Sequence, residues 1–348
     1  MRIRPARVEE CDALTELAMR SKAYWGYDDE FMAACRDELT IRAPFVPRID
    51  VAETDDGRVV GMVRLEPHGP SREHGVLEDL FVEPSAIGTG VGGALFRHVV
   101  RRAAAEGVRT LSIDADPNAR PFYEAMGAVL VGESPSGSIP GRTLPRLELS
   151  VARALVRYGY DDIGATHHDD PVHALAVYAA WLDRLRLDAG ARVLDIGCGS
   201  GGTEARLLVD RGLDVHGVDI SEEQVRLARA RLPEATFERA DIAAWDAPDG
   251  SYDAIVSMYA LIHLPREDLA ALVPRLARWL RPRGQLLATF GAHDWIGTDD
   301  WFGAPMFWDV TDPATTTAWL EAAGFEVVEH FFVPEGDSGH ELFHARLA

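Results

Sequence analysis

The second half of the chain alternates regularly between short apolar stretches and longer stretches with helical periodicity. This alternation constrains the fold strongly, because a helix between two strands carries the chain back across the sheet and leaves the strands parallel. The second half is therefore predicted to form a doubly wound, Rossmann-like α/β sheet of seven mostly parallel strands. The predicted strands are residues 191–197, 214–220, 235–241, 252–258, 284–290, 325–330 and 341–348.

The first half has a different texture, with a run of strands separated only by turn residues. Such a run predicts antiparallel pairing, and the flanking helical stretches make the expected fold a mixed, mostly antiparallel α/β sheet. The predicted strands are residues 2–7, 49–54, 57–66, 74–84, 108–114 and two short ones ending near 149, and the predicted helices are 9–23, 28–39, 89–106 and 117–126. A length of 348 residues favours two domains. We place them at 1–152 and 158–348, with a join that a helix could span.

Composition excludes several classes of partner. The net charge of −21 would repel a nucleic-acid backbone, and no basic cluster offsets it. Lys22 is the only lysine, and the three cysteines have spacings of neither a disulfide framework nor a metal motif. No stretch resembles a signal peptide or a membrane span. We therefore expect a cytoplasmic protein that acts on small-molecule acceptors, away from nucleic acid and membranes, with an oligomeric state that the sequence does not indicate.

Two glycine-rich stretches match the dinucleotide-binding pattern G-x-G-x-x-G. The first contains Gly88, Gly90 and Gly93, and the second contains Gly197, Gly199 and Gly202. In a dinucleotide fold the first glycine follows its strand at once. In the first stretch the residues "EPSAI" separate the strand from Gly88, so these glycines belong to a helix entrance whose N–H groups favour a pyrophosphate.

The first half resembles the GCN5-related N-acetyltransferases (GNAT family) over residues 1–150. Residues 87–92, "IGTGVG", occupy the pyrophosphate motif of that family, although Ile87 stands where Arg or Gln is usual. The tract "LEDLFVEP" is similar to diamine acetyltransferases, and "DPNARPFYEAMGA" matches the last helix of the family. The resemblance implies acetyl-CoA as cofactor. The residues it implies for cofactor binding are Leu80, Phe81, Val82, Gly88, Thr89, Gly90, Val91, Gly92, Gly93 and Asn118.

Acetyl transfer to an amine needs a proton acceptor for the ammonium and a proton donor for the departing thiolate. Glu78 and Asp79 are the candidate acceptors, and the resemblance favours Glu78. Tyr123 stands at the family position of the donor, with packing on an amphipathic helix as the other interpretation. Trp25 and Tyr27 line either the acceptor wall or a contact between helices.

The second glycine stretch follows its strand directly, but it includes the carboxylate of Asp195. That charge would repel the pyrophosphate of NAD, whereas it is compatible with S-adenosylmethionine, which carries a sulfonium and an ammonium. Asp219 ends the next strand and is placed to accept both ribose hydroxyls. Asp241 follows the third strand, where it could accept from the adenine amino group. We predict that neither glycine loop binds NAD.

These residues resemble the class I S-adenosylmethionine-dependent methyltransferases, over about residues 158–348. Asp195, Gly197, Gly199 and Gly201 fill the family motif D/E-x-G-x-G-x-G without a departure. The resemblance implies S-adenosylmethionine as cofactor. It also implies contacts from Ile220, Ile242 and Ser257. Tyr160 is a separate candidate for contact with the methionine end of this cofactor.

Methyl transfer needs aligned reactants and often no base. His263 is the candidate base, although a structural role for it is also open. Residues 290–310 are the expected acceptor lid, with core packing as the other interpretation of their aromatic side chains. The cluster "THHDDPVH" at 166–173 suits a capped helix start better than a metal site, so no metal is predicted.

The sequence thus predicts a bifunctional transferase: an acetyl-CoA-dependent N-acetyltransferase followed by a methyltransferase. An alternative treats the first domain as a non-catalytic acyl-CoA sensor that regulates the methyltransferase, which the departure at Ile87 allows. A second alternative leaves only the acetyltransferase active.

Overall fold

The computed structural model describes residues 1–69, 73–164, 173–335 and 338–348. The chain divides into two compact units, Met1–Ala154 and Leu155–Ala348. Helix α5 (Val151–Ile163) contains the division between them. Most of the cluster at 166–173 lies outside the described residues. No helix in the described ranges is long and apolar enough to cross a membrane.

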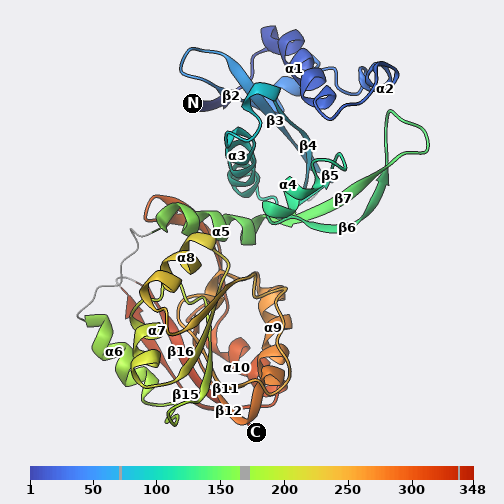
Figure 1. Cartoon of the computed structure of the whole chain (residues 1–348). Coiled ribbons are helices and arrows are strands. Elements are labelled where there is room, and N and C mark those ends of the chain that lie inside the picture. Colours follow the sequence, from blue (N-terminus) through green and yellow to red (C-terminus); the bar gives the residue numbers. More distant parts are fainter. Residues whose placement is uncertain (70–72, 165–172, 336–337) are drawn as a thin grey trace. The chain divides into compact units, whose positions relative to one another are not determined.

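The first unit is built on a seven-stranded sheet with the order β1-β2-β3-β4-β5-β7-β6 (Figure 1). Neighbouring strands are antiparallel except β4 and β5, which are parallel. The strands are β1 (Arg2–Pro5), β2 (Ile49–Glu53), β3 (Val59–His68), β4 (His74–Val82), β5 (Thr110–Asp114), β6 (Val129–Pro135) and β7 (Thr143–Ser150). The helices are α1 (Cys11–Ala23), α2 (Asp29–Cys35), α3 (Val91–Ala105) and α4 (Arg120–Ala125).

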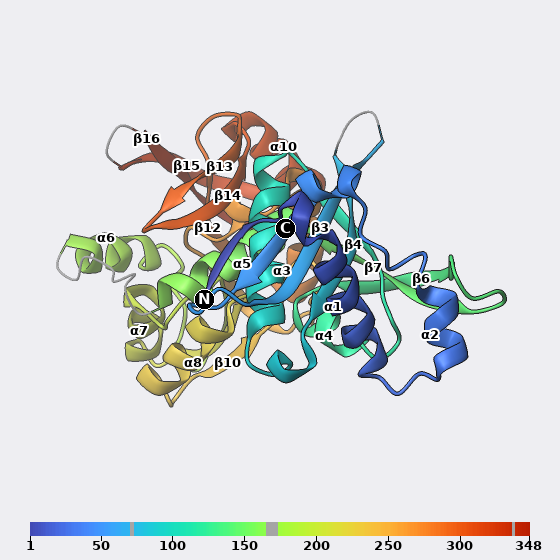
Figure 2. The same cartoon turned by 90° about the horizontal axis from the view of Figure 1, so that it is seen from above.

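Helices cover both faces of this sheet, and adjacent residues of β3 show how. Gly61 faces Leu95 on α3, whereas the next residue, Met62, belongs to a buried cluster with Leu14 and Leu17 of α1. Since successive side chains of a strand point to opposite faces, α1 and α3 lie on opposite sides of the sheet. Figure 2 shows α3 beside β3 and α1 beside β4. Helices α2 and α4 are shorter than their predicted stretches of 28–39 and 117–126.

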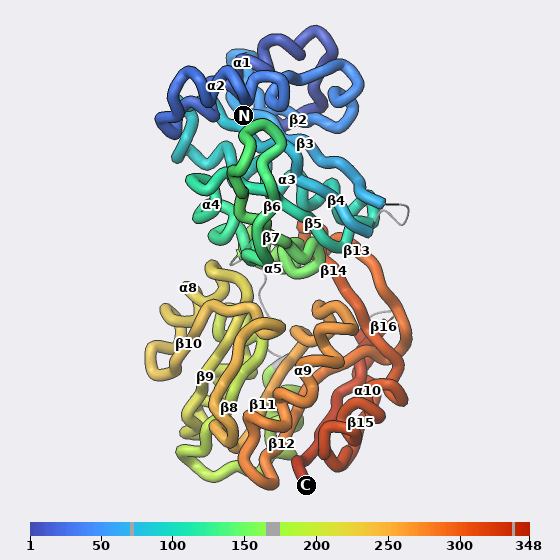
Figure 3. Tube along the Cα trace, turned by 90° about the vertical axis from the view of Figure 1, so that its right-hand side faces the viewer, coloured from blue at the N-terminus to red at the C-terminus, as the bar shows by residue number. Residues whose placement is uncertain are grey.

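The second unit contains a seven-stranded sheet with the order β10-β9-β8-β11-β12-β16-β15 (Figure 3). The first five are parallel, and β16 is antiparallel to both of its neighbours, β12 and β15. This confirms the predicted sheet of seven mostly parallel strands. The strands are β8 (Arg192–Ile196), β9 (Asp214–Asp219), β10 (Thr236–Arg239), β11 (Tyr252–Ser257), β12 (Leu280–Gly291), β15 (Phe325–Glu335) and β16 (Ser338–Leu347).

Helices sandwich this second sheet. Helices α6, α7 and α8 lie on one side of it in Figure 1, and α9 and α10 lie on the other, with a buried apolar cluster on each side. Side-chain caps set several helix starts: Ser221 Oγ accepts from Gln224 N, and Asp312 accepts from Ala314 N and Thr315 N. The helices are α6 (His173–Leu182), α7 (Thr203–Asp210), α8 (Glu222–Arg231), α9 (Arg266–Trp279) and α10 (Pro313–Ala322).

The strand order places a topological switch point beside β8. After β8 the chain builds outward through β9 and β10, and then returns to the other side of β8 with β11 and β12. Loops at the carboxyl ends of β8 and β11 therefore leave in opposite directions, and open α/β sheets bind ligands at such a point. The second glycine loop begins there. Between β12 and α10, residues 295–310 form a separate two-stranded hairpin of β13 (Trp295–Trp301) and β14 (Ala304–Val310).

Candidate active sites

Strand β4 leaves its neighbour β5 halfway along its length. The two strands pair only from His74 to Val76, so residues Leu77 to Val82 have no β5 partner. This divergence exposes one backbone edge of β4 over the predicted cofactor residues Leu80, Phe81 and Val82. One group on β4 is already engaged, because Val82 N–H donates to Ser21 Oγ of α1 over 3.2 Å. Sequence patterns gave no indication of this contact between distant segments.

The first glycine loop forms the start of α3, as predicted. Gly90 is the N-cap with φ of 91°, in the left-handed region that favours glycine, and Gly88 has φ of 80°. A Cβ at Gly88, Gly90 or Gly93 would meet no described atom within 4 Å. The hydroxyl of Thr89 donates to Ala86 O, which closes the turn before the helix. The unobstructed first turn, with Val91, Gly92 and Gly93, is suited to an anion.

Tyr123 is buried on α4 between two phenylalanine rings. Its ring centroid lies 5.2 Å from that of Phe122 and 5.9 Å from that of Phe96. Burial raises the pKa of its hydroxyl far above the usual range, and the charges of Asp79 and Asp116 raise it further. The hydroxyl therefore stays protonated, as a proton donor must.

Asn118 belongs to a polar cluster that sequence reasoning did not anticipate. Asp116 accepts from Lys22 Nζ at 2.7 Å and from Tyr27 OH at 2.9 Å. Asn118 Nδ2 donates to Asp116 at 3.1 Å, and Arg142 donates to Tyr27 OH at 2.8 Å. The predicted wall residue Tyr27 thus joins this cluster, which ties α1, the loop after β5 and the β6–β7 turn together.

The two candidate carboxylates of β4 have different surroundings. Asp79 is buried and accepts from Arg64 Nε at 2.5 Å. Glu78 occupies a β-bulge between the pairs Arg64↔Asp79 and Leu65↔Leu77, and its side chain is 43% exposed. Burial raises the pKa of Glu78, although Arg64, 3.8 Å away, opposes the shift. A bulge re-aims a side chain out of the strand alternation, so Glu78 is the more accessible proton acceptor.

The second glycine loop leads from β8 into α7, and its backbone is hydrogen-bonded to the end of β9. Gly197 N donates to Val218 O, and Gly199 N donates to Asp219 Oδ2 at 2.9 Å. Gly197 has φ of 72°, and a Cβ there would overlap the Cβ of Ala260. This glycine is therefore required by packing within the protein as well as by its backbone conformation. Gly201 also has a left-handed backbone.

Two buried carboxylates lie at this loop. Asp195 is 1% exposed, and neither of its oxygens has a hydrogen-bond partner among the residues that the structure describes. Burial raises its pKa to about 7, and the charge of Asp219 contributes. Burial likewise raises the pKa of Asp219 to about 6, although N–H donors from Ser221 and Gly199 oppose the shift. An unsatisfied buried carboxylate is costly unless a ligand compensates it, so the site favours a cation.

The remaining predicted cofactor residues lie near the same edge of the sheet. Asp241 follows β10 and accepts from Ala243 N, and Ile242 is buried in the core cluster below it. Ile220 follows Asp219 and packs against residues of α5 and β14. Ser257 ends β11, and its hydroxyl donates to Ile196 O at 2.9 Å. Its side chain therefore links the ends of β11 and β8.

Tyr160 and His263 form a hydrogen-bonded pair beside the loop. The Tyr160 hydroxyl is 3.0 Å from His263 Nε2, and His263 Nδ1 is 2.6 Å from the carbonyl oxygen of Phe307 on β14. A carbonyl only accepts, so Nδ1 carries the proton and Nε2 accepts from tyrosine. Burial lowers the pKa of His263 to about 4, which keeps it neutral. With both nitrogens engaged, the geometry favours a structural role for His263 over a role as base.

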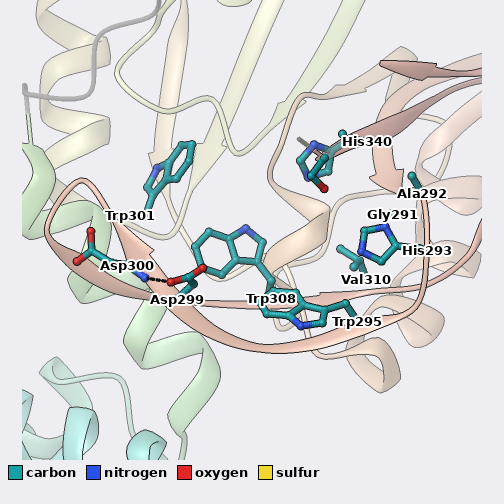
Figure 4. Close-up of a pocket in the computed structure, with 12 residues that line it drawn as sticks. Gly291, Ala292, His293, Trp295, Asp299, Asp300, Trp301, Trp308, Val310 and His340 are labelled. Atoms are coloured by element: carbon teal, nitrogen blue, oxygen red, sulfur yellow. Dashed lines mark hydrogen bonds between the residues drawn. The ribbon is translucent and has the colours of Figure 1, made fainter. Parts of the chain in front are cut away.

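A pocket of about 430 Å³ lies between the β13–β14 hairpin and the ends of β12 and β16 (Figure 4). The side chains of Trp295, Trp301 and Trp308 line it from the hairpin. His293 and His340 face it from beyond β12 and from β16. Within the expected acceptor lid at 290–310, the three tryptophans thus face a cavity, whereas Phe290 packs in the core.

Comparison with known proteins identifies both halves of the chain. Residues 12–128 match the family model "Acetyltransferase (GNAT) family", and residues 193–284 match "Methyltransferase domain". Both families are the ones that the sequence predicted. In addition, a magnesium protoporphyrin IX methyltransferase from Synechocystis is 22% identical over 57% of this chain and all of that one, with a TM-score of 0.46.

Curated relatives are methyltransferases. A ubiquinone biosynthesis O-methyltransferase of Xanthomonas axonopodis pv. citri is 32% identical over 52% of this chain and 80% of its own length. A 2-methyl-6-phytyl-1,4-hydroquinone methyltransferase of Synechocystis sp. is 35% identical over 44% of this chain, which spans 50% of that enzyme. The chain spans only 41% of a trans-aconitate 2-methyltransferase of Azoarcus sp., at 45% identity over 30% of this chain. The chain therefore belongs to the S-adenosylmethionine-dependent methyltransferase family, and a GNAT-family domain precedes its methyltransferase domain.

Proposed function

We propose that the chain is a bifunctional transferase, which acetylates a small-molecule amine with acetyl-CoA and methylates a small molecule with S-adenosylmethionine. The observation that carries the methyltransferase half is the buried, unpartnered carboxylate of Asp195 at the glycine loop. A dinucleotide pyrophosphate would be repelled there, whereas a sulfonium or ammonium would compensate the charge. Small acceptors are proposed because the net charge of −21 disfavours polyanions.

S-Adenosylmethionine would supply a methyl group activated by a positive sulfur. Asp219 would hold the ribose hydroxyls with the lone pairs that its backbone donors leave free, and Asp241 would accept from the adenine. Asp195 would hold the charged methionine end. Tyr160 and His263 would fix the wall beside that end, because their mutual hydrogen bond continues to the backbone of β14.

Acetyl-CoA would supply an acetyl group on a thioester. The uncovered edge of β4 would bind the pantetheine arm, and the first turn of α3 would bind the pyrophosphate. Glu78 would accept a proton from the amine, directly or through water. Tyr123 would donate a proton to the departing thiolate, since its raised pKa keeps it protonated.

A second candidate function makes the GNAT domain a sensor of acyl-CoA. Two observations favour it: Ile87 replaces the usual Arg or Gln, and Ser21 Oγ already occupies the N–H of Val82. Both features would weaken cofactor binding without closing the site. A sensor would bind acetyl-CoA but not turn it over.

Calorimetric titration of the intact protein with acetyl-CoA, S-adenosylmethionine and NAD separates these possibilities. We expect the first two to bind and NAD to show no micromolar affinity. A screen of amines with both donors, read by mass spectrometry, then identifies acetylated and methylated products. Acetyl-CoA binding without acetylation of any amine would favour the sensor, and failure of S-adenosylmethionine to bind would refute the methyltransferase assignment.

A further inference from the structure

The pocket beside the β13–β14 hairpin, shown in Figure 4, indicates which class of substrate the proposed methyltransferase accepts. We propose that this pocket is the acceptor site and that it selects an alkylamine, which is methylated on nitrogen and leaves as an organic cation. The proposal rests on the proposed methyltransferase function, and it adds the chemical class of the acceptor. It follows from the aromatic walls of the pocket, its charge, and its connection to the glycine-loop edge of the sheet.

The aromatic walls come from one short segment. Trp308 lies between the other two indoles: its ring centroid is 6.2 Å from that of Trp295 and 6.3 Å from that of Trp301. The planes are inclined by 45° and 81°, so the three rings do not stack on one another. Inclined indole faces around a cavity are the arrangement that binds quaternary and protonated amines, because the face of an aromatic ring is electronegative.

The charge of the pocket has the matching sign. Residues 291–310 include four aspartates and no lysine or arginine. Asp294 and Asp309 are paired with Arg266. Asp299 and Asp300 line the pocket and accept only from backbone N–H groups, those of Asp300 and Gly303 respectively; among the described residues neither forms an ion pair. A neutral aromatic acceptor would suit the indoles equally well, but it would not use these two carboxylates.

The pocket lies at the same end of the sheet as the predicted cofactor residues. Gly291 ends β12, and β12 runs parallel to β11 and β8, so the pocket lies at the same edge of the sheet as the glycine loop. The Trp308 ring is 5.3 Å from that of His263, which is hydrogen-bonded to Tyr160. One wall therefore joins the pocket to the expected methionine end of the cofactor site.

The chemistry of N-methylation uses this environment during the reaction itself. An alkylamine that enters as an ammonium first gives its proton to water or to a pocket carboxylate, which frees the lone pair of the nitrogen. The nitrogen then forms a bond to the methyl carbon with this lone pair, while the sulfur of the donor keeps the electron pair of the broken carbon–sulfur bond. Positive charge thus passes from sulfur to nitrogen. A tertiary amine needs no further step, and a primary or secondary amine then releases a proton to water. Indole faces and carboxylates stabilise the nitrogen more as its charge develops, which lowers the barrier.

A matched pair of probes tests the proposal. Choline and 3,3-dimethylbutan-1-ol have nearly the same shape, but only choline carries a charge. We would titrate both into the intact protein by calorimetry, with and without saturating S-adenosylhomocysteine. We expect choline to bind at least about tenfold more tightly, in line with cation–π and carboxylate contributions. Equal affinity for the two probes would overturn the proposal.

Substitutions in the pocket test whether the preference for choline over the neutral alcohol arises there. Asp299→Asn and Trp301→Leu should each reduce the preference for choline at least about threefold. Trp301→Phe should retain most of it, which separates loss of the ring from loss of folding. Asp188→Asn, an exposed change before β8 at the opposite edge of the sheet, should have no effect. An unchanged preference in Asp299→Asn and Trp301→Leu would place choline elsewhere and overturn the proposal.

Titration of the same variants with S-adenosylmethionine tests the methyltransferase assignment separately from the cation-binding pocket. We expect its affinity to be unchanged, because the substitutions lie outside the glycine loop. If S-adenosylmethionine fails to bind but choline binds as described, the methyltransferase assignment fails and the cation pocket stands. If S-adenosylmethionine binds but the pocket shows no preference for a cation, only the present proposal fails.

Discussion

The two glycine loops of this protein share the pattern G-x-G-x-x-G, yet their surroundings are opposite. The first follows a proline-containing spacer and opens a helix whose early N–H groups face space without a described obstruction. The second follows β8 at once and holds two buried carboxylates. The first environment suits an anion and the second a cation. The pattern alone therefore specifies a tight backbone, and its neighbours specify the charge of the ligand.

The loops also differ in why they need glycine. At Gly90 the backbone is left-handed, but a side chain would enter open space. At Gly197 a side chain would meet Ala260 in the loop after β11. The space beside Gly90 is therefore open to a ligand, whereas the space beside Gly197 is filled by Ala260.

Substitution of Gly197 or Gly90 by alanine should have the largest effect of these tests, and the two losses of stability should differ. Gly197→Ala should lower the free energy of unfolding by about 2–5 kcal/mol, since left-handed strain adds to overpacking. Gly90→Ala should lower it by about 1–2 kcal/mol, from strain alone. Denaturant unfolding followed by fluorescence reports on the second unit, because every tryptophan except Trp25 lies there. Circular dichroism reports on both units. Similar losses for the two variants would contradict the distinction.

The carboxylates provide the second comparison. Asp219→Ala should weaken S-adenosylmethionine binding by about 1.5–3 kcal/mol, the range for losing hydrogen bonds to a charged group. Acetyl-CoA affinity should stay constant, because sites without shared partners behave additively. Asp214→Ala, at the exposed start of the same strand, is the control. A tenfold change in acetyl-CoA affinity would mean about 1.4 kcal/mol of coupling, and would support the sensor.

Substitution of the predicted proton donor, Tyr123, tests whether the first unit catalyses acetyl transfer. Tyr123→Phe should lower acetyl transfer at least about tenfold while acetyl-CoA still binds, because one donor is lost and the ring remains. Tyr24→Phe, a change at an exposed tyrosine, should leave the rate unchanged. Turnover of Tyr123→Phe at the wild-type rate with a good amine would remove this residue from the mechanism.

The pKa values of Asp195 and Asp219, near 7 and 6, predict that acidification weakens cofactor binding at the second glycine loop but not at the first. A cation favours ionised Asp195 and Asp219, so S-adenosylmethionine affinity should fall by up to about tenfold from pH 8 to pH 6. Binding at pH 6–7 should release protons, which calorimetry in buffers of different ionisation enthalpy detects.

In the free folded protein, Asp195 and Asp219 bind more protons than the same residues of the unfolded chain between about pH 4 and 7, so their contribution to stability should decline as pH rises through that window. Asp195→Asn should reduce this decline. Acetyl-CoA binding should show no comparable loss on acidification. Proton uptake on S-adenosylmethionine binding would reverse the sign and refute the cation site.

Local patterns predicted much of this molecule. Apolar periodicity identified the second sheet, and the motif residues Asp195 and Asp219 are brought together as expected. Contacts between distant segments were not predictable. The divergence of β4 from β5 after Val76 depends on pairing across the sheet, and the bond from Val82 to Ser21 joins residues far apart in the chain. The engagement of both nitrogens of His263 likewise depends on β14.

The ion pair between Lys22 and Asp116 has a practical consequence for tests of the proposed acetyl transfer. The side chain of Lys22, the only lysine, is 15% exposed and its nitrogen is held by a carboxylate. An amine that is shielded and already donates to a carboxylate is a poor nucleophile, so the chain would offer an acetyl thioester little of its own surface to modify. Background self-labelling in acetylation assays should accordingly be low, and amine-reactive dyes will mark few positions on the chain.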